Sequence, residues 1–307
     1  MPIQPVDKIW MDGKLLDWED AQVHVLTHAL HYGSGVFEGI RAYETERGAA
    51  IFRLTDHIRR LFKSAAVYMM DIGFSIEELV AASKETVREN GLKSCYVRPI
   101  VYRGYGEMGL NPIPAPVNVA IAVWPWGTYL GQDCIENGAR LMISSWRRPD
   151  PNVLPAQAKA TGQYINSGLA KVEAVHAGFD DALMLGPDGY VAEATGENLF
   201  VIRDEKVFTP PEASGVLLGV TRDAVMRIAT DLGYEVVERK LTRADVYMAD
   251  EAFLTGTAAE VTPVREVDNR PLGEGGRGPI TKDIQQTYFS AVKGQIEKYD
   301  EWCEYVD

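Results

Sequence analysis

The chain has 307 residues, of which 46% are hydrophobic and 24% charged, so it is long enough to form a large core and about two domains. Its formal net charge of -13, with no basic stripe to offset the acids, argues against nucleic acid or an anionic membrane surface as a partner. Charged residues from Asp7 to Asp17 interrupt the N-terminal segment and leave no apolar signal core, so we expect a cytoplasmic protein.

The first part of the chain alternates short strands with helical patterns. "KIWMDGKLL" and "GIRAYETERGAAIFRL" predict hairpin strands, and helices are predicted near 55–69 and 76–90. "SCYVRPIVYRG" and "VNVAIAVWPW" add further strands. The apolar run at 117–124 is too short for a membrane span and predicts a buried strand. We therefore expect a small α/β domain over residues 1–124.

The second part begins after a segment rich in proline and glycine at 125–131, which predicts a linker that we place at 125–135. "ARLMISSW" then predicts a strand, residues 162–177 a helix, and "DALMLG", "YVAEA" and "NLFVIRD" three more strands. "TRDAVMRIATDLG" predicts a helix with Thr221 near its N-cap, and a long helix is expected from 281 to 300. The mixture excludes all-α and all-β folds, so residues 136–307 are expected to form a larger α/β domain.

Some patterns imitate common sites. "GYGEMG" at 104–109 has the spacing of a dinucleotide-binding loop, but the prolines at 112, 114 and 116 forbid the helix that must follow it. His24, His28 and His31 could line a helical face as zinc ligands, but "HYGSG" ends the pattern and structural histidines are the better interpretation. The three cysteines are widely spaced, which favours free thiols over a disulfide framework or a thiolate metal site.

Other features point to an anionic cofactor. "GVLLGVTRDAV" at 215–225 places a glycine turn before a helix, whose first N–H groups and dipole suit a phosphate. "FLTGTAAE" at 253–260 offers small and hydroxyl residues at a strand end, and Arg60 could supply a matching charge. Each feature also has an ordinary structural explanation: a capped helix, a tight turn and a surface arginine.

Lys159 stands among small uncharged residues in "AQAKATGQYINS", at 156–167, where a surface lysine with a buried stem is the ordinary alternative. Glu193, in "YVAEATGENLF", ends a strand beside a glycine turn and could equally be a solvated or salt-bridged acid. If a pyridine ring lay between the two, the carboxylate could keep the ring nitrogen protonated while the lysine amine formed an imine with an aldehyde.

The sequence resembles the branched-chain amino acid aminotransferases, a family of fold-type IV enzymes that depend on pyridoxal 5'-phosphate (PLP). The resemblance covers nearly the whole chain and rests jointly on "WEDAQVHVLTHALHYGSGVFEGIRAY", "YVRPIVY", "PWGTYLG", "AKATGQYINS", "GENLF", "GVTRDAV" and "FLTGTAAEVTPV". It implies a mixed α/β fold of two domains joined by a short loop. It also implies transamination between leucine, isoleucine or valine and 2-oxoglutarate, with small molecules as the partners.

The same resemblance implies roles for individual residues. Lys159 would form the internal aldimine, Tyr164 would hydrogen-bond the cofactor's phenolic oxygen and Glu193 would pair with the pyridine nitrogen. The implied phosphate-binding residues are Arg60, Leu217, Val220, Thr221 and Thr257. The α-carboxylate of the substrate is expected at the backbone N–H groups of Thr257 and Ala258.

The implied substrate pocket accepts both a branched aliphatic side chain and the carboxylate of glutamate. The apolar walls would come from Phe37, Trp126, Met108 and Leu110, the last two from a partner subunit. Polar and close contacts would come from Tyr32, Gly39, Arg41, Tyr96, Arg98 and Tyr129, although Arg98 could instead be an interior ion pair. A pocket shared by two subunits makes a homodimer the minimal active unit, and members of this family also form hexamers.

Several alternatives remain open. D-amino acid aminotransferase, (R)-selective amine transaminase and aminodeoxychorismate lyase share the fold, but the length, "FEGIRAY", "YVRP" and "MGLNP" favour the branched-chain type. Outside the family, an NAD-dependent dehydrogenase rests only on "GYGEMG". A noncatalytic metabolite-binding protein is opposed by the combination of Lys159, Tyr164 and Glu193.

Overall fold

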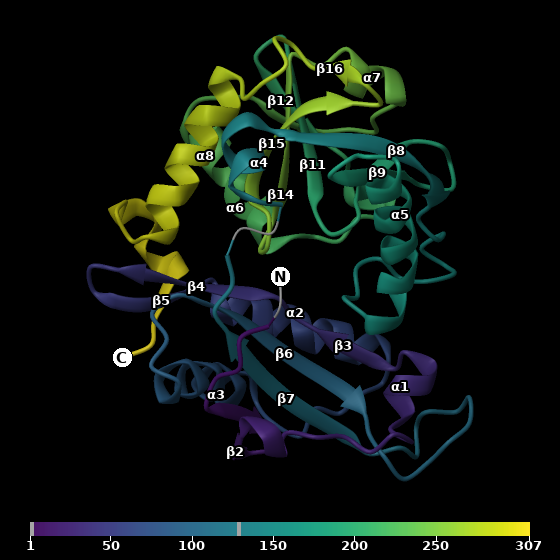
Figure 1. The fold of residues 1–307 in the computed structure, drawn as a ribbon, viewed down its shortest axis with the longest axis vertical. Helices are drawn as coiled ribbons and strands as arrows, with labels where there is room; N and C mark the ends of the chain where they lie inside the picture. The colour runs from purple at the N-terminus through teal and green to yellow at the C-terminus, as the bar shows by residue number, and fades with distance from the viewer. Residues whose placement is uncertain (1–2, 128–129) are drawn as a thin grey trace. The chain divides into compact units, whose positions relative to one another are not determined.

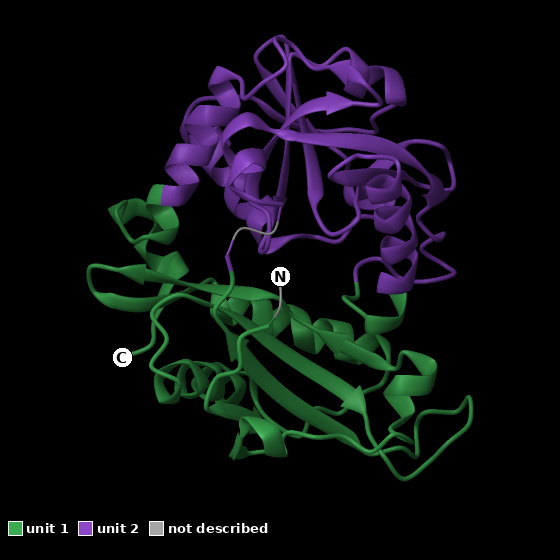
Figure 2. Cartoon of the chain, viewed as in Figure 1, with its two compact units in different colours: residues 1–126, 158–163, 290–307 green, residues 127–157, 164–289 purple. Residues whose placement is uncertain are grey.

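A computed structural model describes residues 3–127 and 130–307, and Figure 1 shows the order of its helices and strands. The chain divides into two units, each built on its own sheet (Figure 2). Unit 1 comprises Met1–Trp126, Ala158–Gln163 and Ser290–Asp307, and unit 2 comprises Gly127–Gln157 and Tyr164–Phe289. Both helices and strands contribute throughout, so the predicted mixed α/β class is confirmed.

Unit 1 contains an antiparallel sheet with the strand order β17-β5-β4-β6-β7-β1-β2, and β3 also pairs with β6. Its strands are β1 (Lys8–Met11), β2 (Lys14–Asp17), β3 (Gly35–Phe37), β4 (Ile40–Thr45), β5 (Gly48–Phe52), β6 (Cys95–Arg103), β7 (Val117–Trp124) and β17 (Cys303–Tyr305). The predicted hairpins are confirmed as the pairs β1–β2 and β4–β5.

The helices of unit 1 close one hydrophobic core. They are α1 (His28–Tyr32), α2 (Leu54–Val67) and α3 (Ile76–Glu89), with short 3-10 turns η1 (Trp18–Asp20), η2 (Thr161–Gln163) and η4 (Glu297–Trp302). Leu54, Ile58 and Leu61 repeat at helical spacing and are fully buried on α2. Ser75 and Glu78 form a capping box that begins α3. Both α2 and α3 match the sequence prediction closely.

Unit 2 contains a mixed sheet with the strand order β10-β9-β8-β15-β14-β11-β12-β13, and β16 pairs with β15. Its strands are β8 (Ala139–Arg147), β9 (Asp181–Leu185), β10 (Val191–Ala194), β11 (Asn198–Arg203), β12 (Lys206–Thr209), β13 (Val236–Glu238), β14 (Glu251–Gly256), β15 (Glu260–Val267) and β16 (Arg270–Pro271). Leu141, Leu183, Leu199 and Leu254 are fully buried at its centre. Their continuous apolar runs are typical of strands covered on both faces.

The helices of unit 2 are α4 (Gln132–Asn137), α5 (Tyr164–His176), α6 (Val220–Asp231), α7 (Arg243–Tyr247) and most of α8 (Pro279–Val292), with the 3-10 turn η3 (Glu212–Ser214). The short helices α1, α4 and α7 were not predicted, because so few turns give little periodicity. No helix in the described part of the chain is long and apolar enough to cross a membrane.

Two features differ from the sequence prediction. The helix expected over 281–300 is wrong in its second half, because α8 ends at Val292 and Gly294 takes a left-handed φ of 66°. The units also do not follow the predicted consecutive segments. The C-terminal strand β17 pairs with β5, and residues 158–163 pack beside β3, so both segments belong to unit 1.

Candidate active site

Lys159 lies in the short segment of unit 1 that follows the first part of unit 2. Its backbone N–H donates to Ser64 Oγ over 3.1 Å, and its carbonyl accepts from the N–H of Phe37 over 3.0 Å. Its neighbours Ala158 and Ala160 are buried. The Nζ atom lies 5.1 Å from the centroid of the Phe37 ring, within cation–π range. The lysine is therefore partly buried over an aromatic ring rather than fully solvated.

Arg60 is held by a carboxylate that the sequence did not single out. Its Nε and Nη2 atoms donate to Glu38 Oε1 and Oε2 over 2.6 and 2.7 Å, and His57 Nδ1 donates to Glu38 Oε2 over 2.7 Å. Glu38 is completely buried. Burial alone would raise the pKa of Glu38, but the charge of Arg60 and the hydrogen bonds hold it well below its usual range. The two parallel hydrogen bonds from Arg60 to Glu38 therefore fix the plane of the Arg60 guanidinium.

Burial is also the main influence on His57. It lowers the pKa of His57 against the opposing effect of Glu38, and the positive charges of Arg60 and Lys159 lower it further. His57 thus serves as a buried hydrogen-bond donor to Glu38, and Glu38 with Arg60 forms the charged pair.

Six residues predicted to line a substrate pocket are linked by contacts within unit 1: Phe37, Gly39, Arg41, Tyr96, Arg98 and Trp126. The rings of Tyr96 and Trp126 lie 4.3 Å apart, and a Cβ atom at Gly39 would overlap the Tyr96 hydroxyl. The Arg98 guanidinium lies 4.7 Å from the Phe37 ring, and its Nη2 donates to Tyr96 Oη over 3.3 Å. This cluster combines aromatic walls with cationic groups.

Three further residues predicted to contact the substrate are exposed in the single chain. Tyr32, Met108 and Leu110 have exposed fractions of 45%, 47% and 87%. Tyr32 packs on His28, whose Nε2 lies 2.8 Å from the Gly109 carbonyl, so α1 and the 104–116 loop are connected. That loop forms no helix, which confirms that "GYGEMG" is not a dinucleotide motif. Tyr129 lies outside the described residues.

The carboxylate of Glu193 in unit 2 is almost completely buried and held by several donors. Oε1 lies 2.7 Å from Arg148 Nη2. Oε2 accepts from Asn198 Nδ2 over 3.1 Å and from the backbone N–H of Leu217 over 3.0 Å. The backbone N–H of Leu217, a residue that the resemblance places near the phosphate, thus donates to this carboxylate.

Helix α6 begins next to the same group. Its N-cap is Gly219, two residues before the predicted position of Thr221, and it carries no side-chain cap. A Cβ atom at Gly219 would lie 2.3 Å from Asn198 Oδ1, so any other residue there would force the Asn198 side chain to shift. The first-turn N–H groups of α6 carry the positive end of the helix dipole and suit an anion. Val220 and Thr221 are the first two residues of this turn.

Two further predicted residues, Thr257 and Ala258, occupy the turn between β14 and β15 and are partly buried. Asn198, the first residue of β11, pairs with Thr255 near the end of β14, so the β14–β15 turn lies close to Asn198. The side chain of Asn198 in turn donates to Glu193. The hydroxyl of Thr255 is buried with no hydrogen-bond partner among the described atoms. Tyr164 is the first residue of α5 and is also partly buried.

The sequence missed Glu38 and Arg148, which hold the predicted residues in place. Glu38 had a weak signal, since it is an acid in the short, mostly apolar stretch between Val36 and Ile40, and an acid that is buried there needs a partner. Arg148 had none that separates it from its neighbour Arg147. In the described part of the chain no group of histidine, cysteine, aspartate or glutamate could hold a metal ion.

Comparisons with known proteins agree with this arrangement. The family model described as amino-transferase class IV matches residues 35–267. A branched-chain-amino-acid aminotransferase of Pseudomonas aeruginosa is 50% identical over 294 residues, covering 96% of this chain and 95% of its own. The chain belongs to the class IV aminotransferases.

Solved structures show the same fold. The crystal structure of the branched-chain amino acid aminotransferase of Escherichia coli matches with a TM-score of 0.96 and 46% identity, over 98% of this chain and 100% of that one. The T.th. branched-chain amino acid aminotransferase complexed with N-(5'-phosphopyridoxyl)-L-glutamate matches with a TM-score of 0.95 and 51% identity, over 99% and 100%.

The cofactor of class IV aminotransferases is PLP, and the described residues fit its chemistry. PLP carries a ring nitrogen that binds a proton, an aldehyde and a phosphate. Unit 2 provides a buried carboxylate, Glu193, with both oxygens fixed, and the start of helix α6 at Gly219, which has no side chain over its first N–H groups. Unit 1 provides a partly buried lysine, Lys159, over an aromatic ring.

Proposed function

We propose that this protein catalyses the reversible transfer of an amino group between branched-chain L-amino acids and 2-oxoglutarate, with PLP as cofactor. The observation that carries the proposal is the placement of Lys159, whose backbone is fixed at both ends while Nζ lies over the Phe37 ring. The relatives named as branched-chain-amino-acid aminotransferases support the substrate class.

PLP supplies an aldehyde that bonds to amines and a ring that withdraws electrons from the substrate. Lys159 Nζ would hold the cofactor through its aldehyde in the resting enzyme, and its free amine would accept and move the Cα proton of a bound substrate. Glu193 would accept a hydrogen bond from the protonated ring nitrogen, and Tyr164 would hydrogen-bond the phenolic oxygen. These roles come from the resemblance, and the fixed positions of Lys159 and Glu193 support them.

The phosphate is assigned to one cation and to backbone amides. Arg60, already oriented by Glu38, supplies the charge. Val220 and Thr221 at the start of α6, and Thr257 in the β14–β15 turn, supply N–H and hydroxyl groups. Leu217 belongs to the same segment, and its N–H donates to Glu193. The substrate α-carboxylate is assigned to the N–H groups of Thr257 and Ala258.

The aromatic and cationic cluster of unit 1 suits two unlike side chains. Phe37 and Trp126 offer apolar faces to a branched aliphatic group. Arg98, Arg41 and the hydroxyl of Tyr96 can bind the carboxylate of glutamate. The relative complexed with a phosphopyridoxyl-glutamate supports glutamate as the second substrate. Tyr32, Gly39, Met108, Leu110 and Tyr129 complete the proposed set.

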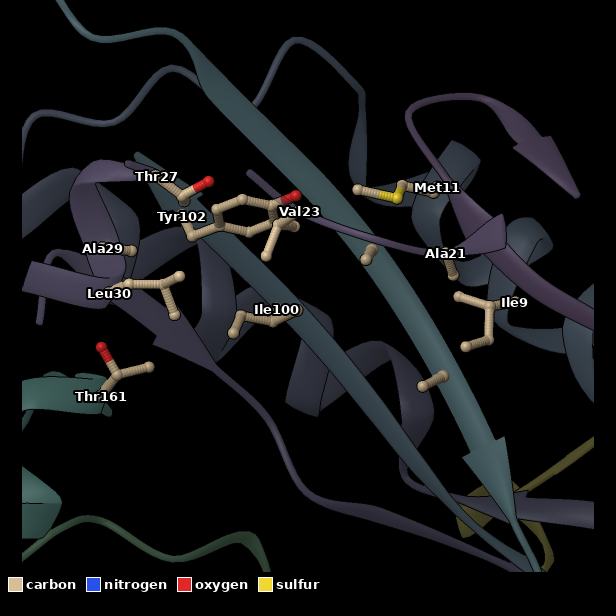
Figure 3. Close-up of a pocket in the computed structure, with 12 residues that line it drawn as sticks. Ile9, Met11, Ala21, Val23, Thr27, Ala29, Leu30, Ile100, Tyr102 and Thr161 are labelled. Atoms are coloured by element: carbon tan, nitrogen blue, oxygen red, sulfur yellow. The ribbon is translucent and has the colours of Figure 1, made fainter. Parts of the chain in front are cut away.

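We propose a homodimer as the minimal active unit. Unit 1 exposes an apolar groove of about 360 Å³, and Val23, Leu30 and Ile100 from it are drawn in Figure 3. Val23 and Leu30 are 48% and 62% exposed. Large exposed apolar patches mark protein contacts, and a second copy could also cover Met108 and Leu110. A cytoplasmic location is part of the same proposal, and the net charge of -13 argues against a nucleic acid partner.

The test is the absorption spectrum of the purified protein after PLP is added, recorded before and after addition of L-leucine without an oxo acid. We expect a yellow band that L-leucine converts to the pyridoxamine spectrum, with one oxo acid released per site. Lys159→Ala should lose this conversion yet still bind PLP through its phosphate.

The same experiment separates the rivals. A band that L-leucine leaves unchanged but a D-amino acid or an amine bleaches assigns the chain to a different activity of the same family. No band at all, or normal turnover by Lys159→Ala, contradicts the proposal outright.

A further inference from the structure

Arg148 is a buried cation that the proposed function does not use. It follows directly after β8, and its backbone N–H donates to the Leu185 carbonyl at the end of β9 over 2.9 Å. This bond anchors the residue to the sheet that also carries Glu193 on β10. The Arg148 side chain is only 9% exposed, so its charge must be compensated inside the protein.

The side chain reaches two groups. Nη2 lies 2.7 Å from Glu193 Oε1, and Nη1 donates to Ser167 Oγ on α5 over 3.3 Å. The Nε atom is buried with no hydrogen-bond partner in the described structure. A buried ion pair with such incomplete hydrogen bonding adds little to folding stability, and apolar residues often replace such pairs without loss. A contribution to folding stability is therefore a weak explanation for the ion pair between Arg148 and Glu193.

Glu193 receives donors from separate segments of unit 2. Arg148 follows β8, Asn198 begins β11, and Leu217 lies in the loop before α6. All of these donors favour the ionised form of the carboxyl group, and together they fix its plane. An acid held in this way is a poor proton acceptor although it remains a good hydrogen-bond acceptor.

We propose that Arg148 is a positioning residue for the reaction: it fixes the Glu193 carboxylate and keeps it from taking the proton of the cofactor's ring nitrogen. This inference rests on the proposed function, in which Glu193 faces that nitrogen. The protonated ring withdraws electrons from the substrate, so a proton that moved toward Glu193 would weaken the chemical step. Arg148 acts only through Glu193.

The test uses three variants of the PLP-loaded protein. Arg148→Gln removes the charge, and Arg148→Lys keeps a charge but loses the two-armed geometry. Arg147→Gln is the matched control, because Arg147 is the adjacent residue, is exposed, and has a weak contact of 3.4 Å to the Pro187 carbonyl. The readouts are the 15N NMR shift of ring-labelled PLP, the dissociation constant of PLP and the single-turnover rate with saturating L-leucine.

For Arg148→Gln we expect the 15N shift to move toward that of an unprotonated ring, and the single-turnover rate to fall about tenfold or more. The dissociation constant of PLP should change far less, because the phosphate contacts are untouched. Arg148→Lys should keep the 15N shift and lower the rate by a smaller factor. Arg147→Gln should match the parent in all three readouts.

Other results overturn the inference. An Arg148→Gln protein with the parent's shift and rate shows that the pair has no role in the reaction. A lowered rate with an unchanged 15N shift and a weakened PLP complex indicates a structural role only. If Arg148→Gln does not fold, Arg148→Lys decides, and a parent-like rate in that variant rules out positioning. A parent protein that binds PLP but ignores L-leucine contradicts the proposed function instead, and the 15N shift still tests Arg148.

Discussion

Glu38 is the residue in unit 1 on which the orientation of Arg60 depends. It has no exposed surface, and its two oxygens accept from Arg60 and His57. Ser64 on the same helix as Arg60 also fixes the backbone of Lys159. The proposed phosphate cation and the proposed catalytic lysine are thus both anchored through α2. Removing the buried charge of Glu38 should therefore lower the stability of the fold, whether or not the cofactor is bound.

Replacing Glu38 by glutamine should lower the free energy of unfolding of the apoprotein by about 3–5 kcal/mol, because it removes the buried carboxylate charge that pairs with the largely buried Arg60 cation. Urea unfolding followed by circular dichroism measures this. Glu44→Gln is the control, since the Glu44 ion pair with Lys93 is exposed and contributes little. Equal stabilities of the two variants would mean that Arg60 finds another partner.

Glu197 should make stability depend on pH. Burial, followed by the negative charge of Asp181, raises its pKa to about 8 from an ordinary value of 4.5. The folded state therefore binds more protons than the unfolded state between these two values, and stability falls as pH rises through that window. Glu197→Gln should flatten the decline when unfolding free energies are measured at pH 5 and pH 8. The exposed Glu235→Gln serves as control, and an unchanged slope in Glu197→Gln contradicts the assignment.

The sequence could predict some of these residues but not others. Lys159 and Glu193 were recognisable because the residues around them match a family motif. Arg148 was not, because the pairing of β8 with β9 shifts register between Ile143 and Arg147. After such an irregularity the alternation of inward and outward side chains no longer follows from counting residues. Which of two adjacent arginines is buried was therefore decided by tertiary structure.

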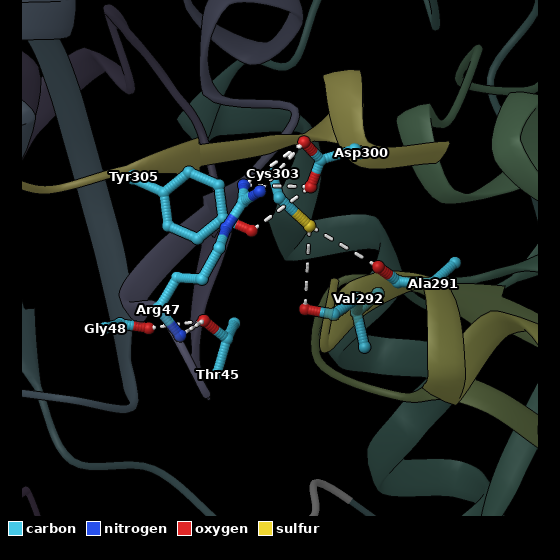
Figure 4. Close-up of polar contacts among 8 residues, drawn as sticks. All are labelled: Thr45, Arg47, Gly48, Ala291, Val292, Asp300, Cys303 and Tyr305. Carbon is cyan, nitrogen blue, oxygen red and sulfur yellow. Dashed lines mark hydrogen bonds and ion pairs between the residues drawn. The ribbon is translucent and has the colours of Figure 1, made fainter. Parts of the chain in front are cut away.

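At the scale of elements, the C-terminal end shows how a single glycine redirects the chain. The sequence predicted one helix over 281–300, since nothing in its periodicity required a break. The N–H of Gly294 donates to the Ala291 carbonyl over 3.0 Å, which ends α8 and allows β17 to pair with β5. Figure 4 shows the result: the Tyr305 ring lies against Arg47 in the turn between β4 and β5, and Cys303 Sγ donates a hydrogen bond to the Ala291 carbonyl.

Gly294→Ala should therefore destabilise the protein by two separate effects. The positive φ strains any other residue by about 1–2 kcal/mol. A Cβ atom there would also lie 2.8 Å from the Tyr305 hydroxyl. Gly91→Ala is the matched control, because Gly91 has a φ of 60° and open space around its Cβ position.

Thermal unfolding of these variants separates strain from overlap. The melting temperature should fall further for Gly294→Ala than for Gly91→Ala, and adding Tyr305→Phe to Gly294→Ala should recover the difference. If the double variant is no more stable than Gly294→Ala, the overlap with the hydroxyl contributes nothing. The element boundary would then depend on backbone strain alone.

At the scale of the whole molecule, the mixed α/β class and the family followed from sequence, whereas the division into units did not. Strand pairing between residues far apart in the chain, as in β17 with β5, is not visible in local patterns. The exposed apolar face was also invisible, because an apolar residue in a strand predicts burial without saying against what. That face, defined by the groove in Figure 3, connects the fold to the proposed dimer.

Leu30→Asp should convert the dimer to a monomer, because it would place a charge in an apolar contact and leave it without a partner there. Sedimentation velocity measures the mass, and the L-leucine half-reaction measured on the same samples tells whether the monomer is active. Met248→Asp is the control: Met248 is 55% exposed in unit 2, outside the groove. A Leu30→Asp protein that keeps the parent's mass, or a Met248→Asp protein that dissociates equally, would place the contact on another surface. A fully active monomer would instead remove the argument that exposed Met108 and Leu110 serve a partner's pocket.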